Sequence, residues 1–249
     1  MNNKGWELNN DCLNLVGDLD LNQVSDILKI ERIRVIQPWK FMPSNETWQL
    51  LNEHLFKNRP TIEFHIWADT IKSDFSFLGK MSNVNILDLN QVKFKNKKTL
   101  GYLTQLKSLT LINGNVNELD FLKELTNLEY LCLGRIRGLN DISFISELKK
   151  LKELEINNQA QLTELPDFEE LRELKILKLF SIKNLFDVSK INSIKNLEEL
   201  HFFNLHTEIE PDQFEFLNSK TTLKKVAGNF NKQDKSNRFE TLTKEINCA

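Results

Sequence analysis

Hydrophobic positions recur with a fixed period along most of the chain. From residue 84 onward the frame L-x-x-L-x-L returns every 22 or 23 residues, and a final step of 26 leads to a degraded copy at 223–228. The clearest copies are Val84, Leu87 and Leu89; Leu106, Leu109 and Leu111; Leu128, Leu131 and Leu133; Leu151, Leu154 and Ile156; Leu174, Leu177 and Leu179; and Leu197, Leu200 and Phe202. Spacing of two in L-x-L predicts a short strand whose alternate side chains face a core.

The second half of each copy is also periodic, with apolar residues at every third position, as in Leu139, Ile142, Ile145 and Leu148. A spacing of three favours a tight 3₁₀ or short helical turn. Each copy therefore predicts one strand, a turn and a helical return. Weaker copies extend the pattern backwards, which gives ten strands in all. We expect them near residues 13, 33, 64, 87, 109, 131, 154, 177, 200 and 226.

We expect a single domain over residues 1–249 that consists of three segments. Residues 1–60 hold irregular repeats and an N-terminal cap, with an inserted helix near 44–57 that Ser44 caps and Pro60 ends. Residues 61–228 hold the regular repeats. In 229–249, Phe239, Leu242 and Ile246 share one helical face, so we expect a C-terminal helix that caps the last repeat.

The strand motifs, such as TNLEYLCL within residues 126–133, resemble those of the leucine-rich-repeat superfamily. The period of 22 or 23 is similar to that of internalins and of a regulatory subunit of protein phosphatase 1. The resemblance covers residues 61–228. It implies an α/β solenoid, a curved right-handed superhelix with about ten short parallel strands on its concave side. Short helices or 3₁₀ turns would form its convex side.

One column departs from that family, which usually has Asn three residues after the last strand leucine. Here the column has no Asn and reads Val92, Gly114, Ile136, Gln159, Ile182 and Leu205. Because unpaired buried amides are costly, the turn backbone must find other partners. The apolar residues predict that this edge packs hydrophobically.

An acidic column precedes the helical returns: Glu118, Asp141, Glu164 and Asp187. One interpretation is a ladder of carboxylates for cations. The other, which we favour, is a set of caps for the N-termini of the short helical turns.

Residues between the inward leucines should face the concave side of the sheet. The candidate partner-binding residues on this side are Glu63, His65, Trp67, Asp88, Asn90, Ile112, Tyr130, Glu153, Glu155, Lys178, Phe180, His201 and Phe203. The same frame places Arg32, Arg34 and Ile36 there. Aromatic residues among polar ones are typical of protein-binding hot spots. Phe180 and Phe203 should lie about 5 Å apart, one strand spacing. They could instead only cover each other or lie under the C-terminal tail.

Composition narrows the partner class. Net charge is −2, with Lys+Arg 33 against Asp+Glu 35, and charges on the concave side are mixed, so nucleic acid is not expected. The start of the chain has no run typical of a signal peptide, no stretch reaches the length of a membrane span, and three cysteines form no disulfide framework. These features favour a cytoplasmic protein, and frequent Lys, Asn and Ile suggest a bacterial source.

The repeat spacing also separates the candidate catalytic residues. His65 and His201 lie six strands apart, about 29 Å at ~4.8 Å per strand, so they cannot share a metal. Cys132 has no histidine nearby, and no Gly-rich phosphate loop is present. We therefore expect no enzyme, no metal and no cofactor. The leading hypothesis is a protein-interaction module, monomeric when free, including the narrower hypothesis of an inhibitor or immunity protein. The alternative is a scaffold that forms homodimers through its exposed aromatics.

Overall fold

The computed structural model describes residues 4–67, 75–90, 97–114 and 119–246. The chain divides into two compact units, Met1–Gly114 and Asn115–Ala249.

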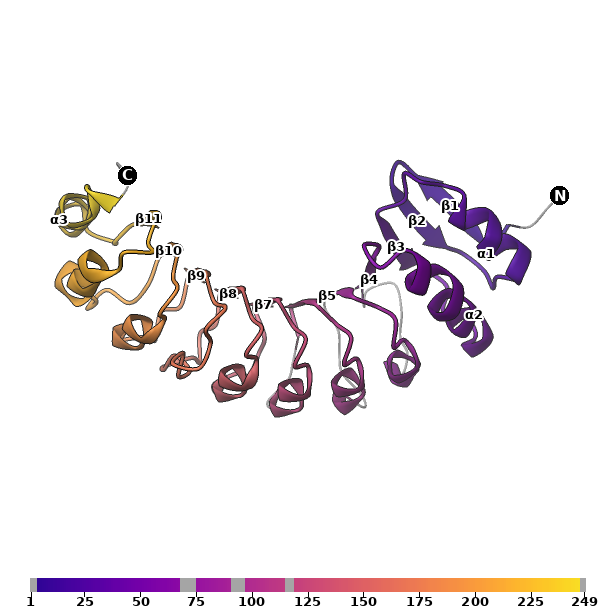
Figure 1. Ribbon diagram of the computed structural model, residues 1–249, viewed down its shortest axis with the longest axis horizontal. Helices are drawn as coiled ribbons and strands as arrows, with labels where there is room; N and C mark the ends of the chain where they lie inside the picture. Colours follow the sequence, from indigo (N-terminus) through magenta and orange to yellow (C-terminus); the bar gives the residue numbers. More distant parts are fainter. Residues whose placement is uncertain (1–3, 68–74, 91–96, 115–118, 247–249) are drawn as a thin grey trace. The chain divides into compact units, whose positions relative to one another are not determined.

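The first unit is a sheet of six described strands with short helical connections (Figure 1). β1 pairs antiparallel with β2, and the pairings from β2 through β6 are parallel and follow the chain order. Its strands are β1 (Trp6–Asn9), β2 (Cys12–Leu15), β3 (Val35–Pro38), β4 (Glu63–Trp67), β5 (Ile86–Asn90) and β6 (Ser108–Ile112). Its helical elements are α1 (Leu21–Leu28), α2 (Asn45–Leu50), the π-helix η1 (Leu51–Phe56), and the 3₁₀ helices η3 (Phe75–Lys80) and η4 (Lys97–Tyr102).

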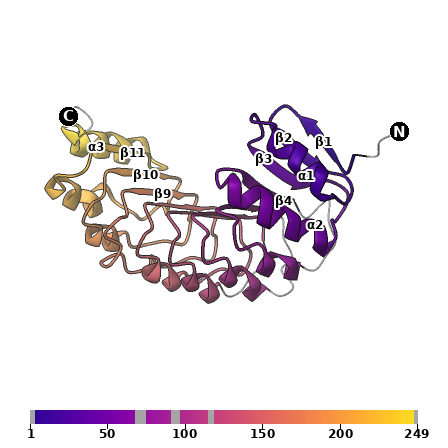
Figure 2. The ribbon, with the colours of Figure 1, turned by 45° about the vertical axis from the view of Figure 1, so that its right-hand side comes forward.

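The second unit repeats a simpler plan. Strands β7 to β11 pair in parallel and in chain order. They are β7 (Tyr130–Gly134), β8 (Glu153–Asn157), β9 (Ile176–Phe180), β10 (Glu199–Phe203) and β11 (Lys225–Gly228). The helical elements are η5 (Asp120–Glu124), η6 (Ser143–Glu147), η7 (Ser189–Ser193), η8 (Pro211–Ser219) and α3 (Gln233–Thr243). In this unit the helical turns lie on one side of the strands, and the other side carries no helix (Figures 1 and 2).

Alternation along each strand defines the core, as the L-x-L spacing predicted. Leu131, Leu154, Leu177 and Leu200 occupy the second position of successive strands and are all 0% exposed. The first, third and fifth positions of β8, β9 and β10 are half-buried or exposed. Because side chains alternate across a strand, one face of each sheet is the core and the other is open.

The N-terminal region corrects two predictions. The hairpin strand β1 was not expected, so the described strands number eleven rather than ten. The strand predicted near residue 33 lies later, at Val35–Pro38. Val35 pairs with Glu63 and faces outward, while Ile36 is 0% exposed and pairs with Phe64.

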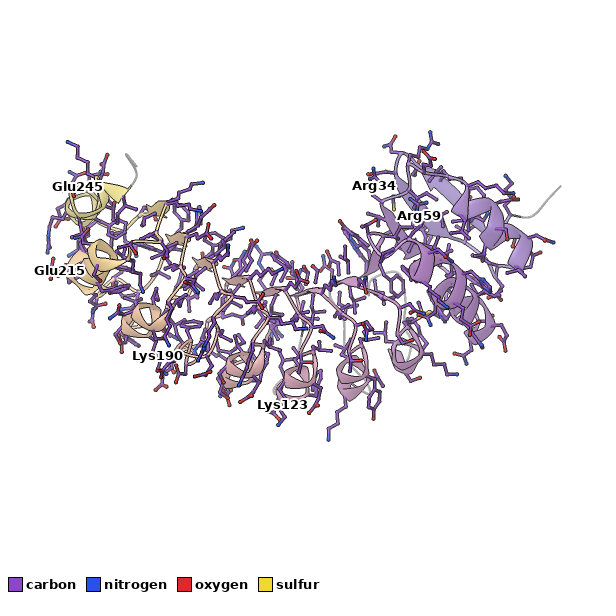
Figure 3. The ribbon with its side chains drawn as sticks, viewed as in Figure 1. Arg34, Arg59, Lys123, Lys190, Glu215 and Glu245 are labelled. Atoms are coloured by element: carbon purple, nitrogen blue, oxygen red, sulfur yellow. The ribbon has the colours of Figure 1, made fainter. Side chains whose placement is uncertain are left out.

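The cause of that error is a proline in a leucine position. The true frame is Ile33, Ile36 and Pro38, all buried, which keeps the spacing of three and then two. A slip of one residue exchanges the two faces of a strand. The prediction that Ile36 lies on the open face was therefore wrong. Arg32 and Arg34 (Figure 3) precede β3 and are not part of it.

The helix expected from Ser44 is present. The Ser44 hydroxyl accepts a hydrogen bond from the Thr47 N–H at 3.3 Å, which caps α2, and the helix continues as the π-helix η1. After it, the Arg59 guanidinium (Figure 3) donates to the carbonyl oxygens of Ile30 at 2.8 Å and Ile33 at 2.7 Å. This side chain ties the inserted helix to the turn before β3.

Helix α3 packs against the last repeat. Its Phe239 is 2% exposed, and the Phe239 ring lies 4.9 Å from that of Phe202 and 5.3 Å from that of Phe214. Phe202 and Phe214 also stack, with centroids 4.6 Å apart. A Cβ at Gly228 would lie only 2.3 Å from the Phe202 ring, so glycine lets that ring enter the cluster.

The turns after the strands satisfy their backbone hydrogen bonds without the column of asparagines. Ile136, Ile182 and Leu205 are buried, as predicted, while Val92 lies outside the described residues. The residue just after the strand instead takes a left-handed conformation, in Asn113, Arg135, Asn158, Ser181 and Asn204. The N–H groups of three of them donate to the carbonyl oxygen of the last residue in the next strand: Arg135 to Asn157, Asn158 to Phe180, and Ser181 to Phe203.

Gln159 is the one buried polar member of that column, with 1% of its surface exposed. In the amide orientation that satisfies its neighbours, Nε2 donates to the Ile136 carbonyl at 3.1 Å. Its Oε1 then accepts from the Ile136 N–H and the Arg135 N–H, each at 3.3 Å. The Gln159 side chain thus joins its own turn to the backbone of the preceding turn, in place of the family's Asn.

Gln159→Leu should therefore destabilise the second unit by about 1–3 kcal/mol, because the Ile136 N–H loses its Gln159 partner and the Ile136 carbonyl keeps only its 3.4 Å bond from the Leu139 N–H. The matched control is Gln161→Leu, an exposed glutamine in the same turn, which should change the unfolding free energy by less than about 0.5 kcal/mol. Denaturant unfolding followed by circular dichroism measures both. Equal effects of the two substitutions would show that the amide bridge contributes nothing.

Candidate interaction surfaces

The open face of each sheet carries the candidate residues. In the first unit, strands β4 to β6 bring Glu63, Ile86 and Ser108 into one row, His65, Asp88 and Thr110 into the next, and Trp67, Asn90 and Ile112 into a third. In the second unit, the corresponding rows of β7 to β10 are Tyr130, Glu153, Ile176 and Glu199; Cys132, Glu155, Lys178 and His201; and Gly134, Asn157, Phe180 and Phe203. All thirteen predicted site residues lie on these two faces.

On the first face, His65 lies between two carboxylates. Its Nε2 is 2.9 Å from Oε2 of Glu63 on the same strand, and Asp88 is its partner on β5. Burial raises the pKa of Asp88, and the neighbouring His65 opposes this shift. One Asp88 oxygen is buried and accepts no hydrogen bond. Trp67, at the end of β4, is 49% exposed.

On the second face, most charges are paired. Lys178 Nζ lies 2.5 Å from Oε1 of Glu153, and that hydrogen bond raises the pKa of Lys178. His201 Nε2 lies 2.9 Å from Oε2 of Glu199. The bond from His201 is the main cause that lowers the pKa of Glu199. Glu155, by contrast, forms no ion pair among the described residues.

Tyr130 and Cys132 occupy β7, the first strand of this second face. Burial is the main cause that raises the pKa of Tyr130, and Cys132 and Glu155 add to it. The phenol therefore stays protonated and can donate a hydrogen bond. Cys132 is 5% exposed and Gly134 is buried, so this strand presents little side-chain surface beyond Tyr130.

Phe180 and Phe203 form a stacked pair on the open face. Their ring centroids lie 5.6 Å apart with an angle of 28° between planes, close to the expected strand spacing. Phe203 remains 39% exposed. The aromatic residues of the C-terminal segment, Phe230 and Phe239, pack against Phe202 on the core side. The tail therefore leaves Phe203 accessible.

Comparison with known proteins gives the fold a name. No protein-family model and no curated protein matches the sequence. Among solved structures, internalin C2 from Listeria monocytogenes matches with a TM-score of 0.57 and 21% identity, over 85% of this chain and 84% of that one. The internalin InlF from the same organism matches with a TM-score of 0.52 and 19% identity, over 88% of this chain and 74% of that one.

A third solved structure is the leucine-rich-repeat domain of the type III effector XopL, with a TM-score of 0.50 and 19% identity, over 84% of this chain and 69% of that one. This chain has the leucine-rich-repeat fold. At such identities the likeness concerns the fold and carries no ligand across. The predicted α/β solenoid class is confirmed.

Three exposed aromatic residues lie outside the open faces of the repeats and were not predicted: Trp39, Tyr102 and Phe186. Tyr102, in η4, is 68% exposed and Phe186, in the turn after β9, is 49% exposed. The Phe186 ring lies 4.0 Å from the His206 ring. These positions fall outside the repeat frame, so periodicity alone could not find them.

The acidic column of the leucine-rich repeats was predicted to cap the short helical turns, and its members differ in what they bind. Asp141 and Asp187 accept hydrogen bonds from the N–H groups of Ser143 at 2.8 Å and Ser189 at 2.7 Å, and these bonds lower the pKa of both carboxyls. Glu164 instead lies 3.8 Å from Lys190 (Figure 3). Glu118 lies outside the described residues. The two aspartates thus each satisfy the first N–H group of a 3₁₀ helix, but from the position before the N-cap, which is Ile142 in η6 and Val188 in η7.

Other candidate chemistry is dispersed. Across the part of the chain that the structure describes, no three His, Cys, Asp or Glu side chains are grouped so that they could hold a metal ion. Cys12 and Cys132 form no disulfide within the part of the chain that the structure describes, and Cys248 lies outside it. None of the described helices is long and apolar enough to cross a membrane.

Proposed function

We propose that this leucine-rich-repeat chain is a non-catalytic protein-interaction module that binds its partner through the open sheet faces. The observation that supports this most is the same in both units. A solvent-exposed aromatic side chain, Trp67 in one and Phe203 in the other, ends a strand whose preceding outward residues are a Glu–His pair. Aromatic anchors within polar, half-buried surroundings are typical of binding hot spots.

The polar groups around the anchors favour a folded protein as the partner over a polyanion. On the second face Glu153 with Lys178 and Glu199 with His201 form fixed pairs, which give a mixed and directional charge pattern. Such a pattern selects a complementary surface, whereas nucleic acid needs a basic stripe. A partner held on these faces would have its own contact surface covered, so an inhibitor or immunity protein is the specific form of this function that we propose.

Alanine at the predicted anchors Trp67, Tyr130, Phe180 and Phe203 should remove partner capture from a native-host extract and leave the fold intact. The matched control is the double variant Tyr102→Ala/Phe186→Ala, which removes two more exposed rings that lie off the sheet faces. Quantitative mass spectrometry compares the proteins captured by wild type, control and face variant, and circular dichroism checks folding.

The proposal requires a captured protein that is lost by about tenfold or more in the face variant and retained by the control, as expected when several hot-spot rings are removed. If capture persists in the folded face variant, the open faces are not the binding surface. Light scattering on the purified chain tests the alternative of a self-associating scaffold. If the wild-type chain is a dimer and the face variant is a monomer, the partner is a second copy of the chain.

A further inference from the structure

Three aromatic rings elsewhere in this chain lie under a lysine of the chain itself. Lys4 Nζ lies 4.9 Å from the centroid of the Trp6 ring, and Lys40 Nζ lies 5.9 Å from that of Trp39. In the second unit Lys220 Nζ lies 5.9 Å from the centroid of Phe216. The electron-rich face of an aromatic ring attracts a cation within about 6 Å. The stacked pair Phe180 and Phe203 has no such cation among the described residues.

The two lysines of the second face do not fill this position. Lys178 is held by Glu153 at 2.5 Å. Lys225 pairs in register with Glu199, at the first position of its strand. Phe203 is four residues further along β10, about 13 Å at ~3.3 Å per residue. The rings of Phe180 and Phe203 thus face solvent without a cation.

The same face carries one more carboxylate than its ion pairs use. Its described strand positions carry three glutamates, Glu153, Glu155 and Glu199, against Lys178 and Lys225, which leaves one formal negative charge when His201 is neutral. Glu153 and Glu199 have partners, so the surplus lies at Glu155. Glu155 is paired in register with Lys178, two residues before Phe180, so its carboxylate is a diagonal neighbour of the Phe180 ring, and Phe203 lies one strand further.

We propose that the Phe180–Phe203 pair and Glu155 form a subsite for an arginine side chain of the partner protein. This inference rests on the proposed function and names the chemistry of one contact within it. The planar guanidinium can stack on the Phe180–Phe203 pair with its donors toward the Glu155 carboxylate, whereas an ammonium is compact and more strongly hydrated. On the other side of Glu155, its in-register neighbour on β7 is the small and buried Cys132.

The probe is N-acetyl-argininamide, titrated into the full chain up to its solubility limit and followed by NMR of the phenylalanine rings and glutamate carboxyls. N-acetyl-citrullinamide, of the same shape without charge, and N-acetyl-lysinamide serve as comparisons. We expect saturable shifts at Phe180, Phe203 and Glu155, and affinity roughly three- to fivefold weaker in E155Q. The control is E215Q, the same change at an exposed glutamate of η8 on the helical side (Figure 3), where affinity should not change.

The outcomes separate this inference from the broader function. Absent shifts, equal binding of citrullinamide, or unchanged affinity in a folded E155Q would overturn the subsite, and equal binding of lysinamide would overturn the choice of arginine. None of these results affects the capture experiment with the face variant, which tests the proposed function itself. Conversely, argininamide binding together with partner capture that survives in the face variant would contradict the proposed function and leave only the subsite chemistry.

Discussion

Phe202→Ala should cost the second unit about 3–5 kcal/mol of unfolding free energy, the usual range for a large aromatic residue removed from a core. Phe202 is 0% exposed, and its ring contacts those of Phe214, Phe230 and Phe239 at centroid distances of 4.6, 5.5 and 4.9 Å. These three rings come from three different elements after β10. The substitution would therefore leave a cavity that no single neighbour can fill.

The adjacent residue supplies the control. Phe203→Ala removes a ring of the same size from the open face, where it is 39% exposed and stacks only on Phe180. Its loss should cost about 1 kcal/mol, the contribution of one exposed aromatic pair. A cost for Phe203→Ala as large as that for Phe202→Ala would contradict the assignment of the two faces of β10.

The readout matters because the four tryptophans, Trp6, Trp39, Trp48 and Trp67, all lie in the first unit. Tryptophan fluorescence therefore reports on the first unit. Circular dichroism and hydrogen exchange of the β10 and β11 amides report on the second. In an array of repeats, neighbouring units can unfold separately, so the local measurement is the more direct one.

The regular repeats could be predicted because each apolar position of the motif places its side chain in the core. In Leu174, Leu177 and Leu179 the spacing of three and two places every side chain in the core, and no other arrangement buries all three. The frame failed at β3, where Pro38 takes the last leucine position and the neighbouring Ile33 and Val35 imitate an L-x-L pair. The strand β1 also lacked a repeat partner to predict it, because it pairs antiparallel with β2.

The candidate surfaces followed from the same alternation, but their chemistry did not. Periodicity placed Phe180 and Phe203 in one row, and their contact depends only on the strand spacing. Lys178 could form an ion pair with either Glu153 or Glu155, and in the structure it pairs with Glu153. The sequence alone does not determine which of the two carboxylates is left unpaired. That choice is made by side-chain geometry in three dimensions, as is the use of Gln159 in place of an asparagine.

A chain that ends at Gly228 should lose solubility and unfold at a temperature roughly 10 °C lower, since the ring cluster below it is worth several kcal/mol. The deletion removes Phe230 and Phe239, which cover Phe202 and Phe214. It also removes Lys235, whose buried ammonium donates to the Thr207 and Ile209 carbonyls at 2.8 and 3.2 Å.

Two kinds of group are therefore uncovered together, aromatic surface and turn carbonyls, and both are costly to leave without partners. The matched control is a chain that ends at Ile246, which keeps all of α3. Light scattering and thermal unfolding by circular dichroism compare the two truncations with the full chain. The chain that ends at Ile246 should behave as the full chain, because it retains the ring cluster and the Lys235 contacts. If the chain that ends at Gly228 stays monodisperse with an unchanged midpoint of thermal unfolding, α3 does not cap the last repeat.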